Sequence, residues 1–261
     1  MEIDLSDLDF AFRKMHAAKH SRHDVSDRIA PSLFQYDYLV LSTLATDMQR
    51  LIEEIPCRDD SDQDTAVALD LGCGKSPYRF LLESRGFSVK TMDISLDGAA
   101  DFQGTIEETG LPDRSIDLAI CTQVLEHSID PGQGLREICR ILRPGGYLIV
   151  TAPHIWFYHP HPSDNWRFTQ EGLPRLVAAC GFEPMRLLAQ GGSVLSYFQI
   201  VNFLLFGLAG KLAAPVYAIN NVIGKWGDNL LTNRLFCLNF AVLARKAEFS
   251  TAHQRGTEFS A

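Results

Sequence analysis

The chain has 261 residues, of which 46% are hydrophobic and 21% are charged, and its formal net charge is −8. This composition is that of an ordinary globular protein, and the length suits one large α/β domain with or without additions. The acidic balance argues against duplex nucleic acid as a partner, because there is no basic excess to displace the counterions of the phosphates.

The cysteines indicate a reducing compartment. Six of them lie far apart along the chain, at Cys57, Cys73, Cys121, Cys139, Cys180 and Cys237. No CxxC pair occurs, so we interpret them as free thiols and not as a disulfide framework or a zinc site. The first thirty residues are charged throughout and contain no apolar segment typical of a secretory signal. We therefore expect a cytoplasmic protein.

Residues 1–64 are predicted to form an N-terminal helical lid followed by an acidic loop. Apolar residues recur at helical spacing near the start, at Leu5, Leu8, Phe12 and Met15, and a second helical pattern spans 33–55. The basic stretch "RKMHAAKHSRHD" between them is either a solvated helix face or part of a lid over a ligand pocket. The stretch "CRDDSDQDT" then reads as a loop that leads into the main domain.

From residue 65 onward, short apolar runs alternate with helical patterns. Strands are predicted at 66–70, 88–93, 115–122, 146–152, 184–189 and 236–244, with a weaker one near 99–103. Helices are predicted at 77–85, 132–142 and 170–180. This alternation favours an α/β domain with a mostly parallel sheet and helices on both faces. We assign 65–190 and 234–246 to this domain, 191–233 to an apolar helical insertion and 247–261 to a flexible tail. Sheets of this kind bind ligands at the carboxyl ends of their strands.

The first strand ends in a glycine turn, "LDLGCGKSPYRF". Gly72 and Gly74 allow the backbone to turn sharply and to approach a ligand closely. Ser76 stands at a predicted helix N-cap, with Pro77 at the first helical position. A dinucleotide-binding turn would have its third glycine at position 77, so the proline argues against NAD or FAD. A helix N-terminus after such a turn still suits a smaller anion, such as a carboxylate.

The second strand ends in Asp93, about twenty residues after the turn, where an acid can accept hydrogen bonds from ribose hydroxyls. A glycine turn, a ribose-binding acid and no diphosphate seat together indicate a nucleoside that carries a carboxylate. S-adenosylmethionine has this structure.

Over residues 66–190 and the last strand, the sequence resembles the class I S-adenosylmethionine-dependent methyltransferases. The resemblance rests on "LDLGCGKS", "GTIEETGLPDRSIDLAICTQVLEH", "REICRILRPGGYLIVTAP" and "FCLNFAVLARK", which occur in the order of the family's motifs. It implies a Rossmann-like seven-stranded, mostly parallel sheet with an antiparallel last strand, and S-adenosylmethionine as the cofactor.

The resemblance also implies a set of cofactor-binding residues, which are Asp70, Gly72, Gly74, Asp93, Ile94, Thr105, Ile106 and Gln123. The sequence departs from the family pattern at two of these motifs. The third glycine of the first motif is Ser76, and Thr105 replaces an aspartate that many relatives direct at the adenine amino group. A hydroxyl still forms hydrogen bonds, so we expect an altered affinity.

Histidines follow two strands and are the candidate general bases, namely His127, His154, His159 and His161. His127 lies in "QVLEH", and the other three lie in "APHIWFYHPHPSDNWRFT". The second stretch also supplies the candidate substrate-binding residues, which are Trp156, Tyr158, Asp164, Trp166 and Arg167. Each has a structural alternative, because His127 can cap a turn, and Trp166 and Arg167 can pack a turn onto the next helix.

A metal site is an alternative that we do not predict. His159, His161 and Asp164 form at most half of a ligand set. The stretch "QVLEH" resembles the ExxEH group with which some quinone-type O-methyltransferases bind a metal, but its first position is Gln123 instead of a glutamate, which argues against a metal here. The stretch "HPHPSDNWRFT" is similar to one in methyltransferases that resemble enzymes of glycan or envelope biosynthesis, which implies a sugar or glycolipid acceptor.

The segment 194–220 is unusually apolar. Three polar residues, Ser196, Gln199 and Asn202, share one helical face, and a second helix is expected after Pro215. The pair is either internal or dimer-forming, or it forms a peripheral membrane face at the inner membrane and a wall for a lipid-linked acceptor. A membrane span is disfavoured, because the final strand must rejoin the sheet.

We therefore predict a methyltransferase that acts on an oxygen or nitrogen of a small molecule or lipid-linked sugar. The alternatives are a non-catalytic S-adenosylmethionine-binding protein, a quinone-type O-methyltransferase and a nicotinamide oxidoreductase.

Overall fold

The structure is a computed structural model that describes residues 25–56, 65–96, 98–160, 162–231, 233–234 and 236–247. Several predicted features lie outside these residues: the first helical pattern of the lid, most of the acidic loop, His161 and nearly all of the tail. Five of the six cysteines are within the described residues, and all five are free thiols.

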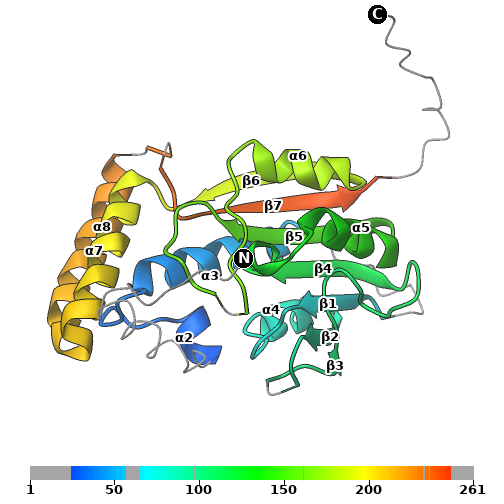
Figure 1. The fold of residues 1–261 in the computed structure, drawn as a ribbon, viewed down its shortest axis with the longest axis horizontal. Helices are drawn as coiled ribbons and strands as arrows, with labels where there is room; N and C mark the ends of the chain where they lie inside the picture. The colour runs from blue at the N-terminus through cyan, green and yellow to red at the C-terminus, as the bar shows by residue number, and fades with distance from the viewer. Residues whose placement is uncertain are drawn as a thin grey trace, which may run out of the picture.

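The centre of the molecule is a seven-stranded sheet (Figure 1). Its strands are β1 (Val67–Leu71), β2 (Ser88–Asp93), β3 (Phe102–Gln103), β4 (Ile116–Thr122), β5 (Leu142–Pro153), β6 (Phe182–Gln190) and β7 (Asn239–Lys246). They lie in the order β3-β2-β1-β4-β5-β7-β6. The pairs from β3 to β5 are parallel, and β7 runs antiparallel to both β5 and β6. The predicted mostly parallel sheet with an antiparallel last strand is confirmed.

Two helical layers cover the sheet, because successive strand residues point to opposite faces. Helices α5 (Pro131–Ile141) and α6 (Gly172–Ala179) pack on one face. Their apolar residues join a core that includes Leu69, Ala119 and Leu148. Helices α3 (Tyr38–Glu53) and α4 (Arg79–Glu83) pack on the other face, against the neighbouring residues of the same strands. A short helix, α2 (Val25–Ile29), precedes α3.

The helix after the glycine turn begins later than predicted. Tyr78 is the N-cap residue of α4, so Ser76 does not cap the helix and Pro77 lies before its first turn. The reason is the backbone at Ser76, whose φ of 47° is in the left-handed region. The Ser76 hydroxyl donates instead to Asp70, which ties the turn to β1.

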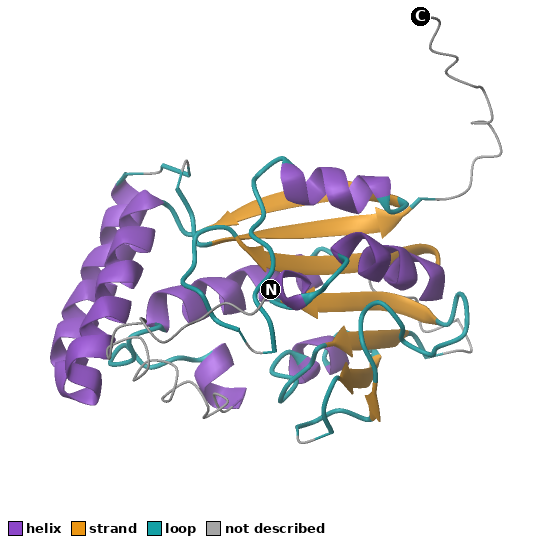
Figure 2. Cartoon of the chain, viewed as in Figure 1, coloured by secondary structure: helices purple, strands orange, loops and turns teal. Residues whose placement is uncertain are grey.

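The apolar insertion is a helical hairpin. It consists of α7 (Ser193–Ala209), the 3₁₀ turn η2 (Gly210–Ala213) and α8 (Ala214–Leu230), which lie within the segment 191–233 that was assigned to the insertion. The two helices pack against each other and against α3. Figure 2 shows the hairpin standing beyond the ends toward which the parallel strands point. It therefore lies at the edge of the sheet where ligands bind in such folds.

Candidate functional site

The glycine turn after β1 has an unusual backbone that two acids hold in place. Gly72 and Gly74 have φ angles of 65° and 55°, a region that glycine adopts at little cost. The Gly74 N–H donates to Asp93 Oδ2 at 2.8 Å, and the Ser76 hydroxyl donates to Asp70 Oδ2 at 2.8 Å. The ends of β1 and β2 are thereby joined through the turn.

Space is distributed unevenly around this turn. A Cβ atom at Gly72 would lie 2.4 Å from Val124 Cγ2, so only glycine fits there. A Cβ atom at Gly74 would meet nothing within 4 Å among the described residues. The turn therefore faces open space at Gly74 and packs against the loop after β4 at Gly72.

The Asp93 side chain has acceptor capacity left for a ligand. Among the described residues it accepts, besides the Gly74 N–H, a 3.4 Å contact from the Ser95 N–H on Oδ1, whereas a carboxylate can accept about four hydrogen bonds. The next side chain, Ile94, is exposed, although it is apolar. An acid beside an exposed aliphatic surface suits a ribose and its attached base, so these residues fit the predicted cofactor.

Asp70 is buried, and burial raises its pKa to about 7, although the hydrogen bond from Ser76 acts in the opposite direction. The Asp70 carboxyl group therefore changes between its protonated and its ionised form near neutral pH. It supports the turn from beneath and is shielded from solvent.

The remaining predicted cofactor residues lie on the loops after β3 and β4. The Thr105 hydroxyl accepts from the Glu108 N–H at 3.2 Å and keeps its own O–H to donate. The Ile106 side chain is buried against Gly134 of α5, which leaves its backbone for any ligand contact. Gln123 has a φ of 55° and donates from Nε2 to Thr151 Oγ1 at 3.1 Å, so it fixes the ends of β4 and β5.

The structure brings an acid and two histidines together, and we call Glu126, His127 and His159 the acid–histidine cluster. Glu126 and His127 lie on the 3₁₀ turn η1 (Leu125–His127) directly after β4. The Nε2 atoms of both histidines lie 3.8 Å from Glu126 Oε1. Glu126 is fully buried, and neither of its oxygens has a hydrogen-bond partner within the described part of the chain.

Backbone carbonyls fix the orientation of both imidazoles. His127 Nδ1 contacts the Ser163 carbonyl oxygen, and His159 Nδ1 lies 3.0 Å from the Phe157 carbonyl oxygen. A carbonyl oxygen only accepts, so each neutral ring carries its proton on Nδ1 and has a lone pair on Nε2. Both Nε2 atoms then face the buried carboxylate, an arrangement that can hold a cation among the three groups.

The cluster adjoins the glycine turn. Val124, which fills the space against Gly72, is the N-cap residue of η1, and the cluster residues Glu126 and His127 follow within that turn. The turn that would hold the cofactor and the turn that holds the cluster are therefore separated by one valine side chain.

His154, another candidate base, is not part of the acid–histidine cluster. Its Nδ1 lies 2.8 Å from the Phe168 carbonyl oxygen, and its ring packs against Phe240 of β7. His161 lies outside the described residues.

All five predicted substrate-binding residues line one open cavity of about 350 Å³, whose walls are Trp156, Tyr158, Asp164, Asn165, Trp166 and Arg167. Arg167 donates from its second terminal nitrogen to Asp164 Oδ2 at 2.7 Å and to the Phe157 carbonyl oxygen at 3.1 Å. Burial alone would raise the pKa of Asp164, but the Arg167 guanidinium and the His159 N–H outweigh burial and lower it. The pair thus shapes the loop that carries the aromatic walls.

The same loop is anchored on η1. The N–H groups of Asn165 and Trp166 donate to the Glu126 carbonyl oxygen at 2.8 and 3.2 Å. The Trp166 indole N–H donates to the Ser128 carbonyl oxygen at 2.9 Å. Three hydrogen bonds therefore join the loop of the cavity to the turn that carries the cluster and to Ser128 after it.

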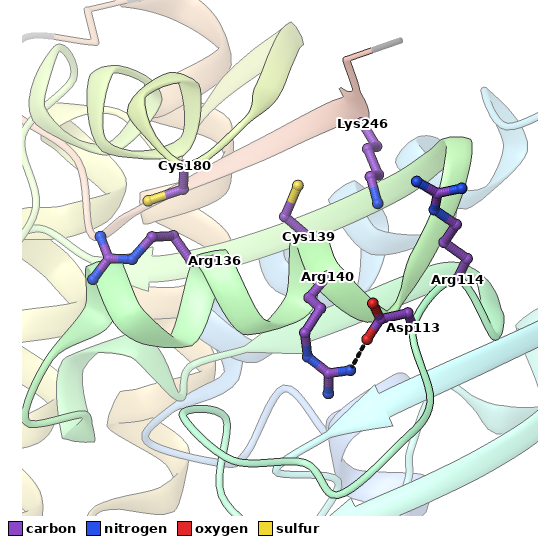
Figure 3. A pocket seen from close by; sticks show the side chains of 7 residues that line it. All are labelled: Asp113, Arg114, Arg136, Cys139, Arg140, Cys180 and Lys246. Carbon is purple, nitrogen blue, oxygen red and sulfur yellow. Dashed lines mark hydrogen bonds and ion pairs between the residues drawn. The ribbon is translucent and has the colours of Figure 1, made fainter. Parts of the chain in front are cut away.

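A second cavity, of about 300 Å³, lies away from this site (Figure 3). Its walls are Asp113, Arg114, Arg136, Cys139, Arg140, Cys180 and Lys246. Arg140 forms an ion pair with Asp113, and Lys246 donates to the Leu142 carbonyl oxygen. Residues just before β4 and at the end of the antiparallel β7 line it, so it lies at the amino ends of the parallel strands, opposite to the usual ligand edge.

Glu126 was absent from the residues selected from sequence. The available signal was its place in "QVLEH", directly before a candidate base at the end of a strand. Its contact with His159, 33 positions away in sequence, depends on the fold of the loop after β5.

Residues 69–150 match a family model described as a methyltransferase domain. A probable S-adenosylmethionine-dependent methyltransferase of Mycolicibacterium smegmatis is 34% identical over 86 residues, which are 31% of this chain and 34% of that protein. A probable S-adenosylmethionine-dependent methyltransferase of Mycobacterium tuberculosis is 29% identical over 150 residues, 51% of this chain and 52% of that protein. The chain thus spans about a third to a half of the length of these relatives.

Solved structures share the fold at low identity. A SAM-dependent methyltransferase from Archaeoglobus fulgidus has a TM-score of 0.52 and 15% identity, and the match covers 85% of this chain and 97% of that one. The [4+2]-cyclase SpnF also has a TM-score of 0.52, with 21% identity over 78% of this chain and 82% of its own. The second structure belongs to a cyclase, so the fold alone does not define the reaction.

Proposed function

This chain contains a class I S-adenosylmethionine-dependent methyltransferase domain, and we propose that it methylates a hydroxyl group of a small or lipid-linked acceptor. The observation that carries the proposal is the acid–histidine cluster, which lies beside the glycine turn and has unprotonated nitrogens directed at a buried acid. An amine acceptor has less need of a built-in base, whereas a hydroxyl must lose its proton as it reacts.

Each part of the site has a role in this reaction. S-adenosylmethionine, when bound, supplies a methyl group on a positively charged sulfur. Asp93 and the turn from Gly72 to Gly74 would hold the cofactor, and Val124 lies between that turn and the turn that carries the cluster. Nε2 of His127 or His159 accepts the hydroxyl proton as the acceptor oxygen gains the methyl group. Glu126 stabilises the imidazolium that forms, because its charge is buried and close.

The cavity walls support a sugar or another ring-containing acceptor. Trp156, Tyr158 and Trp166 offer aromatic faces, and Asn165 offers a polar amide beside them. Such a mixture of apolar area with a few hydrogen-bonding groups is typical of small-molecule sites. The resemblance of the loop to that of glycan-associated methyltransferases supports the same class of acceptor.

The test is turnover of Glu126→Gln and His127→Asn with a panel of glycosides and phenols matched by amines. We expect both variants to lose about 10²- to 10⁴-fold in the rate of S-adenosylhomocysteine formation on hydroxyl acceptors. Their affinity for S-adenosylhomocysteine, measured by calorimetry, should stay within about twofold of the unmodified protein, because neither residue touches the glycine turn. Glu171→Gln, an exposed change on α6, is the matched control.

Two outcomes would contradict this proposal. Turnover of amines but of no hydroxyl acceptor would remove the need for the cluster as a base. Binding of S-adenosylhomocysteine without turnover on the panel or on extracts of the source cell would favour the non-catalytic alternative. His154→Asn tests the remaining described histidine, and a loss confined to that variant would move the base away from the cluster.

A second candidate is metal-assisted methyl transfer. One ligand atom from each of Glu126, His127 and His159 lies within 4.8 Å of the other two. Two imidazoles and a carboxylate form a ligand set for zinc, iron or manganese. Titration of the EDTA-treated protein with zinc measures binding directly, and Glu126→Gln should abolish it. Activity that is unchanged after EDTA treatment would exclude metal assistance, and proton acceptance would remain as the role of the cluster.

A further inference from the structure

The hairpin of α7 and α8 is built with its polar side chains inside. Gln199, Asn202 and Asn221 are fully buried. Asn202 Nδ2 donates to Asn221 Oδ1 at 2.8 Å, and Asn221 Nδ2 donates to the carbonyl oxygens of Leu33 and Gln35 at 2.7 and 3.0 Å. Gln199 Nε2 donates to the Tyr36 carbonyl oxygen at 2.9 Å. The polar face predicted from sequence is therefore the face that binds the rest of the protein.

The opposite side is apolar and exposed, and we call it the apolar outer face. Its principal residues are Leu204, Leu208, Leu212, Ile219, Ile223 and Trp226. Leu208 and Leu212 are 74% and 90% exposed. A soluble monomer rarely displays so many neighbouring large apolar side chains, and such patches mark interaction surfaces.

The charges near this face have one sign. Between residues 193 and 227 the sequence contains two charged residues, Lys211 and Lys225, although the whole chain has a net charge of −8. The next acid, Asp228, is buried and accepts from the N–H groups of Gly192 and Leu195. Lys225 lies over the Tyr38 ring of α3, with 4.9 Å from its Nζ to the ring centroid, so Lys211 in η2 is the lysine that accompanies the apolar outer face on an otherwise acidic protein.

We propose that the apolar outer face docks this protein peripherally on an anionic lipid bilayer. An amphipathic helix whose apolar face carries aliphatic residues and a tryptophan, with a lysine at the tip of the hairpin, suits the boundary between headgroups and acyl chains. Lys211 complements anionic headgroups, which attract a basic residue near the surface with about 1 kcal/mol. An acidic protein would otherwise be repelled by such a membrane.

The charge pattern disfavours a second copy of the chain as the occupant. A two-fold interface places the same patch on both sides. The hairpin contributes Lys211 to this face, and the sequence between residues 193 and 227 has no carboxylate to pair with it, while each copy adds the same negative net charge.

Peripheral docking also fits the connections of the hairpin better than a membrane span does. Residues Ser193–Leu230 are long and apolar enough to cross a membrane, with a mean hydropathy of 1.6 in the most apolar window. However, the inner face holds the backbone of the segment around Leu33 and Tyr36, and a span would carry these groups into hydrocarbon.

Docking would place the acceptor cavity at the membrane surface. Phe157, in the loop that forms the cavity, stacks on Phe203 of α7 with 4.0 Å between ring centroids, and Trp156 contacts the same ring edge-on. This step rests on the proposed function, and it narrows the acceptor class to molecules with a lipid anchor.

The test measures binding of the full chain, without cofactor or acceptor, to vesicles of phosphatidylcholine alone or mixed with phosphatidylglycerol. We expect sedimentation with the mixed vesicles, and at least a tenfold loss of partitioning for Leu208→Gln with Ile219→Gln. The matched control is Phe80→Gln with Met185→Gln, two exposed apolar residues outside the hairpin, which should bind like the unmodified protein. Lys211→Gln should weaken binding to the mixed vesicles by about fivefold.

The readouts separate this inference from the proposed function. Thermal unfolding and calorimetry with S-adenosylhomocysteine should be unchanged in the Leu208/Ile219 variant, so folding and cofactor binding are monitored independently. Equal binding of that variant and the unmodified protein, or no binding to anionic vesicles at all, would overturn the inference. A concentration-dependent dimer in sedimentation, broken by the same two changes and without vesicle binding, would assign the face to a second copy.

Discussion

The sheet and the hairpin solve the same burial problem in opposite ways. In the sheet, apolar residues such as Leu69 and Leu148 fill the core, and polar residues gather at the strand ends. In the hairpin, Asn202 and Asn221 lie inside, and Leu212 lies outside. The sheet follows the rule for a protein in water. The hairpin departs from this rule on its outer side, as the proposed docking on a bilayer would require.

The comparison also separates two uses of a buried polar group. In the sheet domain, the acids at the ends of β1 and β2 hold the turn that faces a ligand. In the hairpin, the amides hold one segment of chain to another. A substitution in the first region should therefore change ligand binding at Asp93 or the pH dependence of stability at Asp70, and a substitution in the second region should change folding.

The largest stability effect is expected at Asp70, whose burial is poorly compensated. Its folded pKa of about 7 lies above the unfolded value, so the native state holds the proton and loses unfolding free energy as pH rises from about 4 to 7. Asp70→Asn removes the titrating group, so the variant does not lose this unfolding free energy as pH rises. The unfolding free energy of the variant minus that of the unmodified protein should therefore be larger at pH 8 than at pH 4, by on the order of 2–4 kcal/mol. Urea unfolding of both proteins at the two pH values measures it, and an equal difference at both would refute the buried-acid assignment.

A smaller effect is expected on cofactor affinity. Asp93→Asn keeps an oxygen for the Gly74 N–H but loses the charge and one acceptor. Hydrogen bonds to charged groups contribute about 1.5–3 kcal/mol, so affinity for S-adenosylhomocysteine should fall by about 10- to 100-fold. Calorimetry measures this, with the exposed Asp113→Asn as control. Unchanged affinity would remove Asp93 from the cofactor site.

The smallest effects are expected in the hairpin, where the informative result is whether an inner or an outer substitution lowers the unfolding free energy more. Asn221→Leu makes the interior more apolar but should destabilise the protein by about 1–3 kcal/mol, because Asn202 and two carbonyl groups lose a partner. Ile219→Gln on the outer face should stay within about 0.5 kcal/mol. Both follow from urea unfolding. The reverse order would mean that the hairpin obeys the same rule as the sheet.

The sequence predicted the strands and the mostly parallel sheet well, because strand patterns and crossover units are local, whereas the antiparallel last strand was implied by the family resemblance. The ends of β1, β2 and β4 placed Asp70, Asp93 and His127 at one edge. The helix start after Pro77 was wrong, because the left-handed backbone at Ser76 arises from its bond to Asp70 and not from helix-capping preference.

Two features depended on contacts that no local pattern contains. The role of Glu126 requires His159, which the loop after β5 brings back to η1. The polar face of α7 was visible from sequence, but its direction was not. That direction depends on carbonyl groups near Leu33 and Tyr36, more than 150 positions earlier.

The hairpin enters and leaves the sheet at one paired position. Gln190 at the end of β6 faces Asn239 at the start of β7, and all of α7 and α8 lies between them. Chain inserted or exchanged between two paired residues leaves the register on both strands intact. This junction is therefore a natural site for modular exchange, through which evolution or engineering could redirect the catalyst to a different surface without rebuilding the cofactor half.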